Sequence, residues 1–371
     1  MTINQKWLDA IGEDVPTTVE ELYTVLKKFA EAGDLNGNGV ADEIPSIGKD
    51  NIYRTDLDEF IINAFVYCED DYFFNVTDGE VWVPYTTDEY REALIYLNKL
   101  YQEGLFSPLF YSIANDVELA SLASPESGVG NVGVIAGHPT IVFKTDNEAL
   151  YEYVPLLPLE SATDIGGWSP MMSNTFRYSV FITTDAEDPE LCFKFLDFWS
   201  SKEGAIRTRY GVLGEHWEYA EEGDISNLGI PATIKVLDDS VWNGTNNFSY
   251  HLDHGTIKTQ SWFGVAWEDD GSWTSYRSKM IAEIFNGYMA GKRPDEIIQT
   301  LVYTTEEQET ATEFSSQIRD YMSEARALFI SGVSDPNDDS QWEKYLDEME
   351  ARGLNDYIAL AQAVYNRMNS Y

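Results

Sequence analysis

Capped amphipathic helices alternate with short apolar segments along the first half of the chain, and this alternation limits the possible folds most. Thr18 and Glu21 have the spacing of a capping box, which predicts a helix with one apolar face. A second such helix is expected to begin after Thr87 and to end at Gly104. The apolar stretch 131–137 is short and bounded by glycine, so we expect a buried strand there. Strands alternating with helices indicate an α/β protein.

The second half of the chain adds one more strand and helix and then closes with helices. We expect a strand at 178–183, and Asp188 followed by Pro189 predicts the start of a helix. Residues 227–271 show little periodicity. Helical periodicity then returns in three stretches, 314–329, 341–352 and 355–369. We expect these last helices to pack back onto the first lobe of an α/β protein.

Length and charge narrow the class of protein. A chain of 371 residues is long enough for about two domains. It carries 24 Lys and Arg against 64 Asp and Glu, a formal net charge of −40. Nucleic acids and anionic membranes would repel such a surface, so we expect neither as a partner.

The cysteines and the apolar runs point away from a disulfide-rich or membrane-spanning protein. Cys68 and Cys192 cannot form a disulfide framework, and neither has the spacing of a zinc site, so both are expected to be buried thiols. No apolar run approaches the roughly 18 to 20 residues that span a bilayer. The first residues lack the pattern of a secretory signal, and the chain taken by itself would be a cytoplasmic soluble protein.

An Asp/Asn/Gly loop follows the first capped helix and is the most specific local motif, Asp34-Leu-Asn36-Gly-Asn38-Gly39-Val40-Ala-Asp42-Glu43. Side-chain oxygens at positions one, three and five, glycine at six and a carbonyl at seven are typical of an EF-hand calcium loop. Pro45 stands where the usual bidentate Glu would be, so Asp42 and Glu43 would have to complete the coordination. The alternative is a plain Asn/Gly turn. A similar stretch, 335–340, has Ser340 at the glycine position and is expected to be a solvated loop.

Aromatic residues are abundant, and many lie in polar or glycine-rich segments. The chain has 10 Trp, 23 Tyr and 18 Phe. Many of them lie outside the periodic apolar stripes of the predicted helices and strands. Flat rings beside polar side chains bind the apolar face and the hydroxyl rim of a sugar. Packing in the core is the alternative for any single ring. The candidates are Trp168, Trp217, Trp242, Tyr250, Trp262 and Trp267.

Signatures of catalysis are weak. Of the four histidines, His251 and His254 form a His-x-x-His pair, but there is no HExxH motif, nucleophile elbow or glycine-rich phosphate loop. A glycosidase needs only two carboxylates, which leaves that alternative open. We expect a binding protein and not an enzyme.

Several stretches together resemble the extracellular solute-binding proteins of carbohydrate ABC transporters, in particular the lipoprotein branch that includes the alginate-binding proteins. The resemblance runs in order from the first residues to the last, and the Asp/Asn/Gly loop is its most specific part. It rests on Ile3-Asn4-Gln-Lys-Trp7-Leu8-Asp9, Val15 to Leu22, Asp34 to Pro45, Tyr90 to Leu105, Gly211-Val-Leu-Gly-Glu-His-Trp217 and Trp342 to Arg367.

The resemblance implies a fold of two α/β lobes that close on a ligand, the type II periplasmic-binding-protein-like architecture. Residues 1–170 and 311–371 would form the lobe with the calcium loop and the closing helices, and residues 171–310 part of the second lobe. The opening lobe segment of the family and its signal peptide with a lipidated cysteine have no counterpart in this sequence. We therefore expect an N-terminally truncated member, whose full-length form would be an extracellular, membrane-anchored lipoprotein.

The resemblance also implies site residues. A structural calcium ion would be held by six residues, Asp34, Asn36, Asn38, Val40 through its carbonyl, Asp42 and Glu43. Related proteins often place a ligand-stacking aromatic near Gly137, but His138 follows it here. His138 and Trp168 are the first choices for ligand contacts, followed by Trp217, Trp242 and Trp267.

The leading functional prediction is a monomeric substrate-binding component that captures an oligosaccharide in the cleft between two lobes and presents it to ABC transporter permease subunits. The net charge favours a neutral over an anionic sugar. A peptide ligand stays open because related binding proteins reuse the scaffold. The alternatives are a glycoside hydrolase or lyase with a carboxylate pair, and a calcium-dependent surface binding module.

Overall fold

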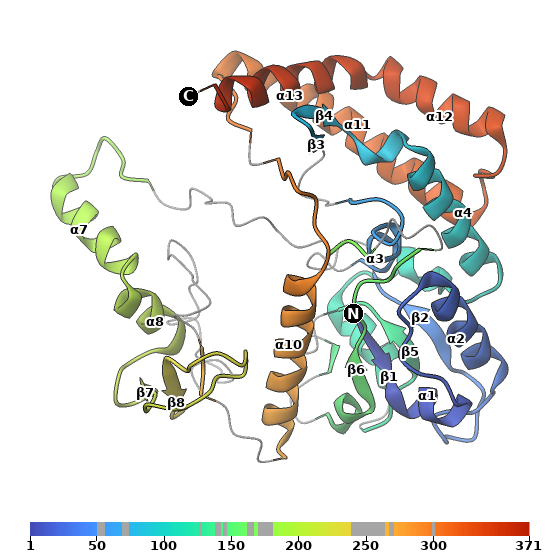
Figure 1. Ribbon diagram of the computed structural model, residues 1–371, viewed down its shortest axis with the longest axis horizontal. Coiled ribbons are helices and arrows are strands. Elements are labelled where there is room, and N and C mark those ends of the chain that lie inside the picture. Colours follow the sequence, from blue (N-terminus) through green and yellow to red (C-terminus); the bar gives the residue numbers. More distant parts are fainter. Residues whose placement is uncertain are drawn as a thin grey trace. The chain divides into compact units, whose positions relative to one another are not determined.

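The structure is a computed structural model that describes residues 1–49, 56–68, 74–125, 128–137, 142–143, 147–161, 167–169, 181–238, 264–266, 271–298 and 301–370. The chain divides into two compact units, drawn in Figure 1. Unit 1 comprises Met1–Thr175 and Ile284–Tyr371, and unit 2 comprises Phe176–Glu283. The lobe bounds expected from the sequence stay a prediction.

A four-stranded sheet forms the centre of unit 1, in the order β2, β5, β1, β6. The middle strands are β5 (Val132–Ile135) and β1 (Thr2–Asn4), and the edges are β2 (Ile44–Ile47) and β6 (Tyr153–Pro155). β2 is parallel to β5, whereas β1 is antiparallel to both neighbours. All four residues of β5 are buried, which confirms the strand predicted within 131–137.

Three helices pack against strands of this sheet. α2 (Val19–Glu31) packs against β2, α5 (Asp116–Ala123) against β5 and α1 (Gln5–Ile11) against β6. The capping box predicted at the start of α2 is present. Gly133 in β5 lies so close to α2 that an added Cβ would stand 2.4 Å from the Phe29 ring, so only glycine fits there.

The remaining elements of unit 1 form a helical layer. α4 (Asp88–Gln102) begins at the predicted Thr87 cap and packs against α11 (Thr305–Ser331) and α3 (Leu57–Ile62). α12 (Asp339–Ala351) and α13 (Leu354–Met368) follow, and Figure 1 shows the hairpin of β3 (Asn75–Thr77) and β4 (Glu80–Trp82) beside α13. Short 3-10 turns lie at Pro84–Thr86, Pro108–Tyr111 and Glu148–Glu152.

The closing helices return to the first half of the chain, as predicted. The side-chain Nδ2 of Asn98 in α4 donates to the Phe329 carbonyl of α11 at 3.1 Å. The Tyr345 hydroxyl of α12 donates to the Tyr85 carbonyl at 3.0 Å. Gln362 of α13 accepts from the Val81 amide at 2.7 Å. These contacts join residues more than 200 positions apart, so the first and last segments fold as one unit.

A buried ion cluster lies where α3 meets α11. The Arg326 guanidinium is 3.2 Å from Asp58 Oδ2 and 3.3 Å from Glu59 Oε1, and all three side chains are nearly inaccessible to solvent. The two carboxylates raise the pKa of Arg326 against the opposing effect of burial. The guanidinium therefore stays charged. Its removal would leave the two buried carboxylates without the positive charge that it provides.

Unit 2 contains α7 (Pro189–Trp199), α8 (Lys202–Tyr210) and a hairpin of β7 (Trp217–Tyr219) with β8 (Ile234–Val236). α10 (Trp273–Ala290) begins in unit 2 and ends in unit 1. Asp188 caps α7 as predicted. Cys68 is buried as expected, but the prediction for Cys192 is wrong. Cys192 is exposed, and no residue of α7 is buried.

Two further observations concern predicted features. The strand expected at 178–183 lies mostly outside the described residues, and its described part, 181–183, is not a strand. Within the described part of the chain, no helix is at once long enough and apolar enough to cross a membrane.

Candidate functional site

The Asp/Asn/Gly loop connects α2 to β2, where an EF-hand would have a second helix. Asp34 begins the loop three residues after α2 ends, and Ile44 begins the strand. Pro45, at position twelve, is thus part of β2. The first half of the loop can follow the EF-hand pattern. The last ligands of a metal ion would have to come from residues that precede the strand.

The carboxylate of Asp34 organises the first half of the loop. Its Oδ1 accepts a hydrogen bond from the Gly37 amide at 2.7 Å and its Oδ2 accepts one from the Gly39 amide at 2.9 Å. Both glycines have positive φ, 81° and 89°. Residues with a side chain rarely adopt this conformation, so the glycines allow the chain to turn around the carboxylate.

The two asparagines continue the same turn. Asn36 Oδ1 accepts from the Asn38 amide at 2.9 Å, and Asn38 Oδ1 accepts from the Val40 amide at 2.7 Å. Asn38 Nδ2 donates to Asp42 Oδ1 at 3.2 Å. The side-chain oxygens of positions one, three and five are therefore fixed by the backbone of the loop itself.

Glu43 closes the loop from the other end and gives the clearest test of a cation site. Its Oε1 accepts hydrogen bonds from the backbone amides of Leu35 and Asn36. Its Oε2 is buried and has no hydrogen-bond partner among the described residues. A buried carboxylate oxygen without a partner is costly unless a cation satisfies it. With Asp34 and Asp42 the loop has three carboxylates and no Lys or Arg between 34 and 43, a donor set that suits calcium.

The predicted ligand set is not assembled around one point. In the part of the chain that the structure describes, no three acidic, histidine or cysteine side chains gather as they would around a metal ion. The six calcium ligands thus stay a prediction. The second acidic stretch caps a helix: Asp338 Oδ1 accepts from the Ser340 amide at the start of α12.

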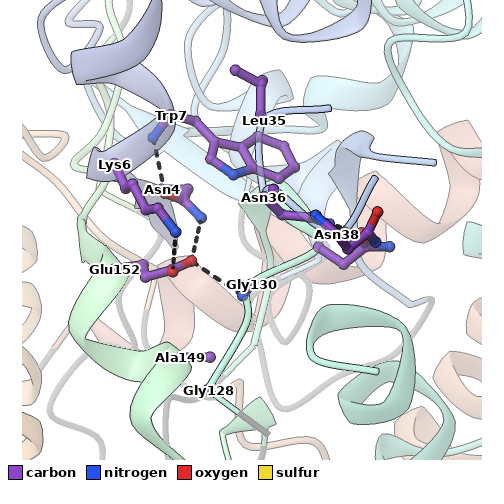
Figure 2. A network of polar contacts seen from close by, with 12 residues as sticks. Asn4, Lys6, Trp7, Leu35, Asn36, Asn38, Gly128, Gly130, Ala149 and Glu152 are labelled. Atoms are coloured by element: carbon purple, nitrogen blue, oxygen red, sulfur yellow. Dashed lines mark hydrogen bonds and ion pairs between the residues drawn. The ribbon is translucent and has the colours of Figure 1, made fainter. Parts of the chain in front are cut away.

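A polar network anchors the strands next to the loop (Figure 2). The Glu152 carboxylate accepts from Lys6 Nζ at 2.9 Å, from Asn4 Nδ2 at 3.3 Å and from the Gly130 amide at 3.1 Å. Asn4 also caps α1 by accepting from the Trp7 amide at 3.1 Å. Glu152 lies at the end of the turn before β6. Through it, the network connects this turn with the start of α1 and with the segment that leads into β5.

Trp168 lies in unit 1 beside a cation and a second ring. Lys292 Nζ lies 4.4 Å from the centroid of the indole, and the Tyr67 ring meets it edge-on at 6.0 Å. The Trp168 amide donates to the Asn63 carbonyl at 3.2 Å. Its indole Nε1 is buried without a hydrogen-bond partner among the described residues. The ring is half-buried, Lys292 lies over it, and its indole donor is buried and unused.

Of the other predicted ligand residues, Trp217 lies in the described part of the chain. Trp217 is fully buried in the core of unit 2, where its Nε1 donates to the Gly211 carbonyl at 2.9 Å. The structure gives Trp217 a packing role and leaves its ring no exposed face. His138, Trp242 and Trp267 lie outside the described residues.

Some neighbours of these sites were not singled out from the sequence. Tyr67, 101 residues before Trp168, and Lys292, 124 residues after it, come from distant segments of the chain. Asn131 contacts Asn36 across 95 residues of sequence. Local spacing contains no signal for contacts of this kind, because folding alone brings the segments together.

Comparison with known proteins gives two relatives. The fructooligosaccharide ABC transporter substrate-binding protein FusA of Streptococcus pneumoniae is 24% identical over 379 aligned positions, which cover 98% of this chain and 65% of the relative. Lipoprotein LipO of Bacillus subtilis is 29% identical over 239 positions, 59% of this chain and 44% of LipO. The chain thus spans less than two thirds of the length of either relative. No family model matches the chain.

Two solved structures have the same fold. An EF-hand mutant of FusA in complex with fructo-nystose superposes with a TM-score of 0.69 at 22% identity, over the whole of this chain and 72% of that one. The alginate-binding protein AlgQ2 without calcium ion superposes with a TM-score of 0.63 at 22% identity, over 98% of this chain and 71% of AlgQ2.

The chain therefore has the α/β fold of solute-binding proteins, which confirms the predicted fold class. At low identity it is similar to the fructooligosaccharide ABC transporter substrate-binding protein FusA, to the alginate-binding protein AlgQ2 and to lipoprotein LipO, in line with the resemblance drawn from the sequence motifs. FusA is named for substrate binding and transport and not for catalysis, in agreement with the prediction of a non-enzymatic protein.

Proposed function

We propose that this chain is the substrate-binding component of a carbohydrate ABC transporter and that it captures an oligosaccharide. The observation that carries the proposal is the similarity to a fructooligosaccharide-binding protein over 98% of the chain. The lobes would be residues 1–170 with 311–371, and residues 171–310. The partners would be the permease subunits of the transporter.

The proposed ligand is a neutral sugar, with Trp168 as the first contact residue. The indole ring and its unpartnered Nε1 support this role, since a sugar offers both an apolar face and hydroxyl acceptors. The net charge of −40 disfavours an anionic ligand. His138, Trp242 and Trp267 complete the proposed contact set.

A fluorescence and calorimetric screen tests the proposal directly. The full chain is titrated with a panel of neutral and acidic oligosaccharides, and we expect saturable binding of a neutral one. Trp168→Ala should then weaken binding about tenfold or more, as buried aromatic contacts do when truncated. Trp82→Ala is the matched control, because the Trp82 indole already donates to Thr77 Oγ1. Failure of every glycan to bind the unchanged chain, or release of reducing ends, would contradict the proposal.

We also propose that the loop from Asp34 to Glu43 binds one structural calcium ion. Bound there, the cation would neutralise the carboxylates and give the buried Glu43 Oε2 a partner. The EF-hand named in the FusA structure supports the proposal, as does AlgQ2, whose solved structure is named as one without calcium ion. Asp34, Asn36, Asn38, Asp42 and Glu43 would contribute side-chain oxygens, and Val40 its carbonyl.

Chelation tests the calcium proposal separately from the sugar. A ligand that binds only the folded state raises the melting temperature, so EGTA should lower it and added calcium should restore it. Magnesium, which prefers a tighter octahedral site, is the control ion. An identical melting temperature with EGTA and with calcium would contradict the proposal.

We propose further that the mature protein is extracellular and anchored as a lipoprotein. The name of the relative LipO supports this location. In source cells, the native protein should then fractionate with membranes and be accessible to protease added outside. Recovery in the cytosol would contradict it.

A further inference from the structure

Asn36 differs from the other side-chain candidates of the loop because it is buried. Its side chain is 7% exposed, whereas Asp34, Asn38 and Asp42 are exposed. Both ends of its carboxamide are bonded: Nδ2 donates to Asn131 Oδ1 at 2.7 Å, and Oδ1 accepts from the Asn38 amide. Asn36, at position three of the loop, is therefore held by one hydrogen bond within the loop and by one to a residue outside it.

Asn131 connects both halves of the loop to strand β5. Its side chain, also 7% exposed, accepts from Asn36 and donates through Nδ2 to the Asp42 carbonyl at 3.4 Å. Its backbone carbonyl accepts from the Ile44 amide at 3.1 Å, and its own amide donates to the Ala123 carbonyl at 2.9 Å. Asn131 directly precedes β5, and Gly130 before it is bound to Glu152 in the network of Figure 2.

These contacts decide which way the Asn36 amide faces. A carboxamide has an acceptor oxygen on one side and a donor NH₂ on the other, and a half-turn exchanges them. After such a turn the Asn36 oxygen would meet the Asn131 oxygen, and its NH₂ would meet the Asn38 amide. Both contacts would be repulsive. Asn131 thus fixes the Asn36 oxygen toward the loop, and a calcium ion binds oxygen and not NH₂.

We propose that Asn131 is a positioning residue of the calcium loop, an inference that rests on the calcium binding proposed above. It orients the Asn36 oxygen before the cation arrives and fixes the distance between the early and late parts of the loop. Pre-organisation of this kind raises affinity, since less conformational freedom is lost on binding.

Three substitutions in the full chain test this role. Asn131→Leu removes the acceptor at similar volume, and we expect calcium affinity to fall about 10- to 100-fold, as it does when outer-shell partners of metal ligands are lost. Asn131→Asp keeps an acceptor for Asn36 Nδ2 but loses the donor to the Asp42 carbonyl, so we expect it to lose less calcium affinity than Asn131→Leu. Asn147→Leu is the matched control: Asn147 lies outside the loop, caps the turn at Glu148–Glu152 and bonds to Ser124 and Gly128.

Calorimetric titration with calcium is the readout, with circular dichroism to verify folding. A second readout is independent of the ion: in the calcium-free protein, the side-chain NH₂ resonance of Asn36 should shift in Asn131→Leu and not in Asn147→Leu. If the leucine variant does not fold, Asn131→Ala replaces it. Calcium affinity in Asn131→Leu equal to that of the unchanged chain would overturn the inference alone. An unchanged chain that takes up no calcium would overturn the calcium proposal itself.

Discussion

At the scale of single residues, Glu43 is the carboxylate on which closure of the loop depends. One of its oxygens accepts from two backbone amides, and the other is buried without a partner among the described residues. Glu43→Gln keeps an oxygen for the amides but removes the charge. We expect calcium affinity to fall about tenfold or more in a calorimetric titration, because affinity follows the number of charged ligands.

The control for Glu43→Gln is Asp335→Asn, in the other acidic loop. Asp335 accepts from the Asn337 amide within a turn before α12 and lies outside the proposed calcium loop. This change should leave the affinity where it is. Equal losses in the two variants would mean that general surface charge, and not the Glu43 carboxylate, attracts the cation.

A second residue-scale prediction concerns the buried ion cluster. Arg326→Met removes the cation between Asp58 and Glu59, which leaves two buried carboxylates without it. We expect the free energy of unfolding to fall by about 3 to 5 kcal/mol. Urea denaturation of the full chain measures the change.

Asp339→Asn is the matched variant for the cluster. Asp339 pairs with Arg91 at 2.8 Å, and the aspartate side chain is 85% exposed. Loss of a pair this exposed should cost under about 1 kcal/mol. A similar cost for Arg326→Met and Asp339→Asn would show that burial does not strengthen the dependence on the Arg326 cluster.

At the scale of elements, the start of α11 contains a pH-dependent contact. Glu307 pairs with Arg367 of α13 and completes a capping box with Thr304, and these bonds, with that of Arg367 the strongest, lower its pKa from 4.5 to about 2. A carboxyl group whose pKa is lowered by folding stabilises the fold above its unfolded pKa. This contribution is lost as the pH falls from about 4.5 toward 2.

Glu307→Gln should therefore be less stable than the unchanged chain at pH 7, and the difference should shrink between pH 4.5 and pH 2. Urea denaturation at a series of pH values measures it. Glu306→Gln removes a charge from the same helical turn and is the control. A difference between Glu307→Gln and the unchanged chain that does not vary with pH would contradict the assignment of the contact.

The elements also show what the sequence can predict. Helix starts at Thr18, Thr87 and Asp188 were predicted because a cap is a bond between near neighbours in sequence. The exposure of Cys192 was not predicted, since the apolar composition of α7 does not say what covers the helix. The loop motif was found by its spacing, but its contact with Asn131 arises only when β5 pairs with β2.

At the scale of the whole molecule, charge and fold point to the same kind of ligand. The fold is that of solute-binding proteins, and a net charge of −40 disfavours anionic ligands at long range. The proposed contact residue Trp168 has an indole donor and an aromatic face. A neutral oligosaccharide can use both without electrostatic repulsion.

The most direct measurement is a calorimetric titration of the full chain, with calcium present, by a neutral oligosaccharide and by a uronate oligosaccharide of the same length. The account predicts saturable binding of a neutral sugar and none of the uronate. It would be contradicted by binding of the uronate alone, or by a folded chain that binds no member of a broad panel of neutral oligosaccharides.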